Sequence, residues 1–227
     1  MYEIFFISYN EPNADNNWKS LKSRFPTARR INGIKGIHQA HLAAAKQSFT
    51  QLFYVVDGDA EILPEFNFDH KALKSDHDMA HVWRSRNPIN DLEYGYGGVK
   101  LLPKAKMLKT DPTKVDMTTS LSDKFCVMET VSNVTAFNTD PFSTWRSAFR
   151  ECVKLSSKAI DRQLDDETNY RLETWCTKGQ DRPFGEHAIQ GATAGRLYGS
   201  SNIGNDVELI KINDFDWLKE KFNEIQS

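Results

Sequence analysis

Leu52-Phe53-Tyr54-Val55-Val56-Asp57-Gly58-Asp59 decides the fold of this chain, because an apolar run ends there abruptly at two acids. The unbroken run of β-branched and aromatic residues predicts a strand buried on both faces of a parallel sheet. Asp57 and Asp59 follow at its carboxyl end, the edge where open α/β sheets bind ligands. Two carboxylates separated by one glycine can turn towards a divalent cation that also contacts phosphate oxygens. The motif therefore predicts a metal-dependent enzyme that acts on a phosphorylated substrate.

Strands and helices alternate before this stretch. Ile4–Ile7 reads as a buried strand, residues from about Asn16 to Phe25 as a helix, and Ala28–Ile31 as a second short strand. Gly36–Phe49 carries small and apolar residues at helical spacing, and its two histidines are expected to pack between helix and sheet. This βαβαβ order predicts an α/β fold with a mostly parallel central sheet and helices on both faces.

The rest of the chain is less regular. Asp140 followed by Pro141 predicts a helix start, because an acid caps the first N–H groups and proline suits the first helical position. The other expected elements are strands at Met79–Arg84, Phe125–Phe137 and Val207–Ile212, a hairpin about Val99–Leu102, and helices at Asp165–Cys176, Glu186–Leu197 and Phe215–Ile225. No repeat or clear linker separates these elements, so we expect one domain.

Composition narrows the class of protein. The chain has 227 residues, 39% of them hydrophobic and 26% charged, with a net charge of −2, as in a soluble globular protein without a global affinity for nucleic acid or membranes. No apolar run approaches the roughly 18 residues of a membrane helix. The N-terminus does not resemble a signal peptide, and the three cysteines form no metal or redox motif. We therefore expect a cytoplasmic protein, and its oligomeric state is left open.

The order of these signals resembles a GT-A glycosyltransferase. The resemblance covers roughly the first 60 residues: the strand and polar turn Ile4–Asn10, the Gly-led, Ala-rich helix that starts at Gly36, and the strand ending in Asp-x-Asp at Val55–Asp59. It implies a single GT-A (Rossmann-like) domain over residues 1–227, with 1–60 as the donor half and about 84–227 as the acceptor side and C-terminal helices. It also implies a nucleotide-sugar donor, expected to be UDP-linked, bound with Mn²⁺ or Mg²⁺.

The resemblance implies roles for individual residues. The turn Ser8-Tyr9-Asn10 would lie under the base and ribose of the donor. Asp57, next to Gly58, would lie near the ribose or the metal, and Asp59 would bind the metal that bridges the diphosphate. His187, late in the chain, is the candidate for a third metal ligand by its position.

Further residues are candidates on chemical grounds. Arg30 and Lys35 precede the helix that starts at Gly36 and are expected to contact phosphate or carboxylate groups, although solvated charges would give the same pattern. An inverting transfer needs a carboxylate base for the acceptor hydroxyl. The Glu-Asp pair of many inverting members has no clear counterpart here, and Asp181 and Glu186 are the substitutes. Whether the enzyme inverts or retains configuration therefore stays open.

The acceptor side is expected at Arg84–Lys114, where basic residues alternate with Trp83, Tyr94 and Tyr96. Charge with aromatic rings is how proteins hold duplex DNA and stack a displaced base, and it also suits sugars. A solvated lysine-rich loop would look the same. The chain as a whole resembles small glycosyltransferase-like proteins of tailed phages, some of which glycosylate hydroxymethylated bases. DNA containing 5-hydroxymethylcytosine is thus one candidate acceptor, in the host cytoplasm if the protein is viral.

Other functions are compatible with the same residues. The acceptor can instead be a glycan or a small molecule. A nucleotidyltransferase uses a similar α/β half and metal-binding acids, but usually has a Gly-rich first turn, which Tyr9–Asn13 lacks. A non-catalytic module that binds nucleotide-sugars would keep the fold without turnover. Donor hydrolysis measured with and without Mn²⁺ separates the enzymes from the binding module.

Overall fold

The structure is a computed structural model, and it describes residues 1–95, 97–111, 121, 125–159 and 164–226. The chain divides into two compact units. The first contains the residues up to Asn87 and the strands between Glu93 and Ala136, and the second contains Pro88–Leu92 and the helices after Phe137. The single domain expected from the sequence stays a prediction, since it concerns whether the two units fold together.

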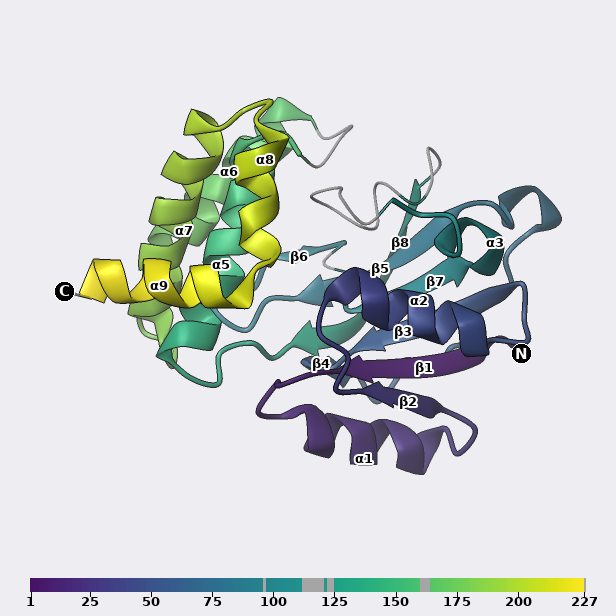
Figure 1. Ribbon diagram of the computed structural model, residues 1–227. Helices are drawn as coiled ribbons and strands as arrows, with labels where there is room; N and C mark the ends of the chain where they lie inside the picture. The colour runs from purple at the N-terminus through teal and green to yellow at the C-terminus, as the bar shows by residue number, and fades with distance from the viewer. Residues whose placement is uncertain (96, 112–120, 122–124, 160–163, 227) are drawn as a thin grey trace. The chain divides into compact units, whose positions relative to one another are not determined.

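The first unit forms an eight-stranded sheet within the described residues (Figure 1). Its strands are β1 (Glu3–Ser8), β2 (Arg29–Asn32), β3 (Leu52–Asp57), β4 (Ala60–Ile62), β5 (Ala80–Arg86), β6 (Glu93–Tyr94), β7 (Val99–Pro103) and β8 (Phe125–Thr135). Its helices are α1 (Ala14–Arg24), α2 (Ile37–Gln47), α3 (Lys104–Met107) and the 3-10 helix η1 (Lys74–Asp76). The strand order is β2-β1-β3-β7-β5-β8-β4, and β6 pairs with β5.

The α/β class is confirmed, but the mostly parallel sheet is wrong. β1 pairs in parallel with β2 and β3, and β5 with β8. The pairs β3–β7, β4–β8, β5–β6 and β5–β7 are antiparallel. A parallel neighbour needs a crossover connection, usually a helix, and no helix lies between β5 and β7 in the described residues. The sheet is therefore mixed.

The sheet is also strongly curled, and the link between β3 and β4 shows why. Only Gly58 and Asp59 separate these strands in sequence, yet β4 lies four positions beyond β3 in the strand order. In a flat sheet those four steps would span about 19 Å, because strands lie about 4.8 Å apart. A two-residue link spans only about 10 Å. The sheet therefore curls into a half-barrel that brings its last strand back beside the end of β3.

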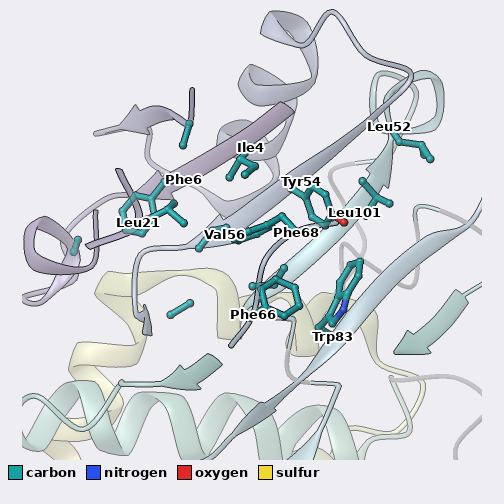
Figure 2. Packing of buried hydrophobic residues seen from close by; sticks show 14 residues of the cluster. Ile4, Phe6, Leu21, Leu52, Tyr54, Val56, Phe66, Phe68, Trp83 and Leu101 are labelled. Carbon is teal, nitrogen blue, oxygen red and sulfur yellow. The ribbon is translucent and has the colours of Figure 1, made fainter. Parts of the chain in front are cut away.

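Helices cover both faces of β1–β3, as predicted. Phe6 of β1 and Tyr54 of β3 pack in one cluster with Leu21 of α1 (Figure 2). The alternate residues of the same strands pack with the small residues of α2 in a second cluster, which includes Phe5, Ile7, Val55, Ala40 and Ala44. Successive side chains of a strand point to opposite faces, so an unbroken apolar run supplies both clusters.

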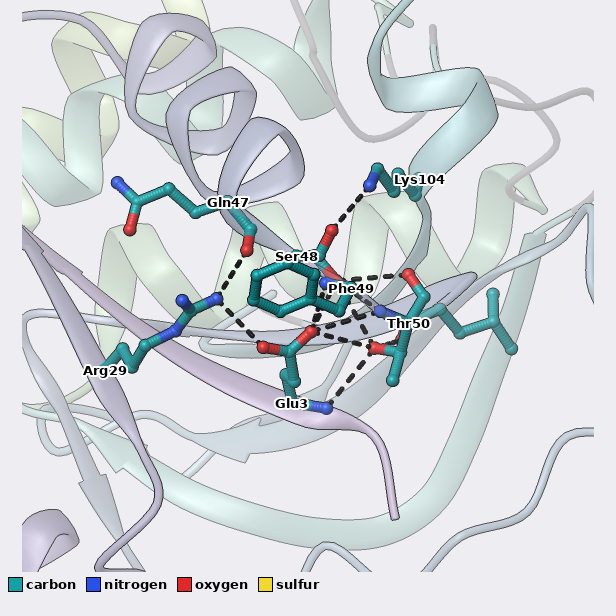
Figure 3. A network of polar contacts seen from close by, with 8 residues as sticks. Glu3, Arg29, Gln47, Ser48, Phe49, Thr50 and Lys104 are labelled. Carbon is teal, nitrogen blue, oxygen red and sulfur yellow. Dashed lines mark hydrogen bonds and ion pairs between the residues drawn. The ribbon is translucent and has the colours of Figure 1, made fainter.

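A carboxylate anchors the amino edge of β1 (Figure 3). Glu3 accepts hydrogen bonds from the backbone N–H groups of Phe49 at 2.5 Å and Thr50 at 3.1 Å, and pairs with Arg29 at 2.9 Å. Burial raises the pKa of Glu3, but these N–H donors, the Ser48 hydroxyl and Arg29 outweigh it, so that the pKa lies below its ordinary value. This network fixes the loop between α2 and β3.

The second unit is helical. Its elements are α5 (Pro141–Ser156), α6 (Asp165–Thr177), α7 (Gly185–Ser201), α8 (Asp206–Leu209), the 3-10 helix η2 (Ile210–Asn213) and α9 (Phe215–Gln226). The predicted cap at Asp140 is confirmed, because its side chain accepts from the N–H of Ser143 at 2.9 Å. The hydrophobic core of the second unit includes Trp145, Phe149 and Phe222. Among the described helices of the chain, none is long and apolar enough to span a membrane.

The strand expected at Val207–Ile212 is wrong, since this segment forms α8 and η2. The side chain of Asn205 accepts from the N–H of Glu208 at 3.3 Å and so caps a helix start. Leu209 and Ile212, three residues apart, are buried, whereas Val207 is 74% exposed. The apolar residues thus follow helical spacing from Leu209 onwards, and Val207 does not belong to the buried face.

Candidate functional site

The carboxyl ends of β1 and β3 form the candidate site. β1 lies between β2 and β3 in the sheet. The chain therefore adds β2 on one side of β1 and then crosses to add β3 on the other side. The loops after β1 and β3 therefore leave adjacent strands at the point where the strand order reverses. In open α/β sheets, ligands bind at the carboxyl ends of the strands at such a switch point. Ile7 stands opposite Asp57 in the register, which places the turn at Ser8 beside the Asp57–Asp59 motif.

A short turn follows β1. Ser8 is buried, whereas Tyr9 is 40% exposed and Asn10 is also exposed. The backbone N–H of Tyr9 donates to Oε2 of Glu11 at 2.8 Å. This bond closes the turn and fixes the Glu11 carboxylate, a residue that the sequence did not single out for the site.

The turns after β1 and β3 touch at Gly58. A Cβ at this position would lie 2.7 Å from Oε2 of Glu11 and 3.2 Å from the carbonyl oxygen of Ile7, so only glycine fits without movement. The amide of Asn17 in α1 donates to the carbonyl of Gly58 at 3.0 Å. The peptide between the two acids is therefore held from the β1 side and from α1, which fixes the path of the motif.

Asp57 forms a bidentate ion pair with a buried lysine. Nζ of Lys100, on the neighbouring strand β7, donates to both carboxylate oxygens of Asp57 at 2.9 Å. The Lys100 side chain is 6% exposed and that of Asp57 is 26% exposed. The backbone N–H of Asp57 also donates to the carbonyl of Gly98 at 2.9 Å. Both the backbone and the side chain of Asp57 are thus engaged by β7 and the loop before it.

His41 of α2 lies near this pair. Its Nδ1 is 2.8 Å from the carbonyl of Ile37, which requires Nδ1 to carry the proton. Burial, followed by the positive charge of Lys100, lowers the pKa of His41 to about 3. The imidazole is therefore neutral at physiological pH, and Lys100 is the cation of this cluster. The predicted packing role of His41 agrees with its complete burial.

The donor set of Asp57 does not fit a divalent cation. A cation bound by Asp57 would have to displace an ammonium group that already occupies both carboxylate oxygens. Among the described residues, no group of three His, Cys, Asp or Glu side chains is placed to hold a metal ion. The Mn²⁺ or Mg²⁺ expected with Asp57, Asp59 and His187 stays a prediction, and no chemical step below depends on it.

The predicted basic residues have different surroundings. Nε of Arg30 donates to Oγ of Ser8 at 3.0 Å, and its guanidinium pairs with Asp15 of α1 at 2.7 Å. Ser8 in turn donates to Asn32 at 2.8 Å. Lys35 is exposed in the loop between β2 and α2. Arg30 thus joins β2 to the end of β1, and the phosphate contacts expected of both basic residues stay predictions.

The candidates from the C-terminal part lie in the second unit. Asp181 is exposed in the turn before α7, and Glu186 is exposed in the first turn of this helix. His187 follows in α7, where its Nδ1 is buried without a hydrogen-bond partner among the described residues. Its ring lies near Phe184 and Phe222, with centroids 6.4 and 6.3 Å apart. The roles expected for these residues in catalysis and metal binding stay predictions.

Several residues of the region expected to bind the acceptor are buried or already paired within the protein. Trp83 and Tyr94 are 3% and 4% exposed, so neither ring is available to stack a base. Arg86 pairs with Glu93 at 2.8 Å, and Nζ of Lys104 donates to the carbonyl of Ser48 at 2.5 Å. Tyr96 and Lys114 lie outside the described residues. Two of the three aromatic rings on which the DNA prediction relied, Trp83 and Tyr94, are therefore buried in the core.

Comparison with known proteins adds no family: no family model matches the chain, and no curated protein matches its sequence significantly.

Proposed function

We propose that this protein is a glycosyltransferase that binds the nucleoside diphosphate of a nucleotide-sugar donor at the carboxyl ends of β1 and β3. The observation that supports it best is the meeting of two turns at the switch point, where Glu11 contacts Gly58 between Asp57 and Asp59. A fixed polar turn on each side of a strand-order reversal is the usual setting for a nucleotide in an α/β sheet.

The chemistry proposed is transfer to a hydroxyl. An acceptor oxygen bonds to the anomeric carbon, the bond from that carbon to the diphosphate oxygen breaks, and the hydroxyl proton passes to a base. The leaving diphosphate keeps the electron pair, so its charge must be stabilised as it develops. Asp181 and Glu186 are the proposed bases, and the sugar and its final configuration stay open.

The acceptor is proposed only as a hydroxyl compound. DNA containing 5-hydroxymethylcytosine remains a candidate from the sequence, and a glycan or a small molecule is equally compatible with the described residues. Incubation of radiolabelled nucleotide-sugars with hydroxymethylated duplex DNA, unmodified duplex DNA and a panel of glycans tests these classes together. Label in the hydroxymethylated DNA alone would support the DNA proposal, whereas label only in a glycan would reject it.

Donor turnover tests the proposal directly. The protein should release a nucleoside diphosphate from at least one of a panel of UDP-, GDP-, ADP- and dTDP-sugars. Asp59→Ala should reduce this rate about 100-fold if Asp59 holds a divalent cation that neutralises the leaving diphosphate. Glu61→Ala, which removes an exposed acid two residues further on, is the matched control and should leave the rate unchanged. A protein that binds and cleaves none of these donors is not a glycosyltransferase.

A further inference from the structure

We infer that Lys100 is a diphosphate-binding residue, and that Asp57 is the positioning residue which holds it rather than a metal ligand. The inference rests on the proposed function, and it assigns Lys100 a role that no motif in the sequence indicates. It concerns the chemical class of the ligand, an inorganic or organic diphosphate.

The geometry of the pair carries the inference. An ammonium group has three N–H donors, and Asp57 accepts from Lys100 through both of its oxygens. Among the described residues, no other acceptor of this ammonium is found, so one donor remains for a ligand. Because the carboxylate fixes Nζ from one side, the remaining donor has a defined direction before any ligand arrives.

A glycine lies beside the buried head of Lys100. Gly97 precedes β7 and has a φ of +83°, a backbone conformation that disfavours other residues. A Cβ at Gly97 would lie 3.0 Å from Cε and 3.7 Å from Nζ of Lys100. At Gly98 a Cβ would crowd Asn133, 2.5 Å from its Nδ2. Gly97 therefore keeps a side chain away from the ammonium at the edge where the nucleotide is proposed to bind, whereas Gly98 makes room for Asn133.

The burial of the pair points in the same direction. Taking a lysine and an aspartate out of water is costly, and an apolar pair of similar size would often stabilise the fold as well or better. A buried charge at the ligand-binding edge of a sheet is thus a candidate for function. Neutral His41 leaves Lys100 as the only positive charge of this cluster of three residues, and diphosphate is the anion of the proposed donor.

Pyrophosphate is the probe that tests the inference. Binding of inorganic pyrophosphate to the full-length protein would be measured by calorimetry in EDTA and again with Mn²⁺. Lys100→Met, which keeps the length of the side chain and removes its charge, should weaken binding about 10- to 100-fold in whichever medium the wild type binds. Lys100→Arg should recover part of this loss. Unchanged affinity of Lys100→Met, or no binding to the wild type in either medium, overturns the inference.

Asp57→Asn separates the positioning role from metal binding. Its Oδ1 can still accept from Lys100, so pyrophosphate should bind within about threefold of the wild type, with the same response to Mn²⁺. A metal-ligand role requires the opposite, namely loss of any Mn²⁺ stimulation in Asp57→Asn. Circular dichroism would verify folding. If Lys100→Met does not fold, Asp57→Asn with Lys100→Met removes both charges and leaves neither unpaired, and it should show the same loss of binding.

The outcomes distinguish this inference from the proposed function. Lys100-dependent binding of pyrophosphate without turnover of any nucleotide-sugar rejects the glycosyltransferase and keeps the anion site. Turnover that is equally fast in Lys100→Met keeps the glycosyltransferase and rejects the role of Lys100.

Discussion

The carboxylate of Glu11 lies against the backbone of Gly58, so that a Cβ at position 58 would be 2.7 Å from Oε2. The same oxygen accepts the N–H of Tyr9 at 2.8 Å. One side chain thus holds the turn after β1 and contacts the turn after β3. The two segments of the candidate site depend on each other, although 47 positions separate Glu11 from Gly58 in the sequence.

Gly58→Ala tests this dependence. The added methyl group must displace the Glu11 carboxylate, which lies at the end of a flexible side chain, so we expect a loss of about 1 kcal/mol in the free energy of unfolding. Urea unfolding would measure it in the wild type and in a Glu11→Ala background. The cost should be smaller in that background, because the main clashing atom is gone, while the contact with the Ile7 carbonyl remains. An equal cost in both backgrounds would contradict the proposed contact.

A second prediction concerns the neutral state of His41. Its pKa is about 3 in the folded protein and near 6.5 when unfolded, so the unfolded chain binds one more proton between these values. The free energy of unfolding should therefore fall by about 1.4 kcal/mol for each pH unit below 6.5, down to pH 3. His41→Asn, whose amide can still donate to the Ile37 carbonyl, should show a pH dependence flatter by this slope. Denaturant unfolding at pH 7, 6, 5 and 4 would measure both proteins.

His81 provides the internal check on that experiment. Burial, followed by the charge of His70, lowers the pKa of His81 as well, so acid destabilises the fold through His81 in both proteins. Subtraction of the two curves removes this shared contribution. Parallel curves for the wild type and His41→Asn would show that His41 does not titrate in the way expected.

The sequence was sufficient for the elements whose signals are local. β1–β3 and their helices follow from apolar runs, small-residue faces and a proline, and these determine short-range structure before any distant contact forms. The place of Asp57 and Asp59 at a strand end followed from the same run. The order and direction of the later strands could not be predicted in this way. β5, β7 and β8 are arranged by pairing over long sequence distances, which hydrophobic periodicity does not encode.

The site residues were missed for the same reason. Lys100 stands among several other basic residues between Arg84 and Lys114, and nothing in its local sequence distinguishes it from a solvated lysine. Only the antiparallel pairing of β7 with β3 brings it to Asp57, 43 residues away. Glu11 lies within the polar segment Tyr9–Asn13, and nothing in that segment marks its carboxylate as a neighbour of Gly58. The one usable signal was the run Gly97-Gly98 before the strand Val99–Pro103, because glycines beside a strand are typical of close approach to a backbone or a ligand.

A third prediction concerns the helix pair of the second unit. Gly191, Gly195 and Gly199 of α7 face the backbone of α5, and a Cβ at Gly195 would lie within 3.0 Å of the Phe149 backbone. Alanine favours a helix by about 1 kcal/mol over glycine, yet Gly195→Ala should lower the free energy of unfolding by about 1–2 kcal/mol, because close packing outweighs propensity. Thr193→Ala, on an exposed position of α7, should change it by less than about 0.5 kcal/mol. A stabilised Gly195→Ala protein would contradict the close approach of the helices.

The last prediction concerns Glu3, whose pKa is lowered in the folded protein although burial alone would raise it. A carboxylate with a depressed pKa stabilises the fold above its unfolded value near 4.5, and this stabilisation is lost as pH falls through the folded pKa. Glu3→Gln removes the charge that Arg29 and two backbone N–H groups contact, so we expect a loss of about 1.5–3 kcal/mol at pH 7. The difference from the wild type should shrink as pH falls from about 4.5 through the lowered pKa of Glu3, because that side chain then becomes neutral as well. Glu65→Gln, at an exposed acid, is the control and should have no effect at either pH. A difference that is constant from pH 7 to pH 3 would show that Glu3 acts through its shape and not its charge.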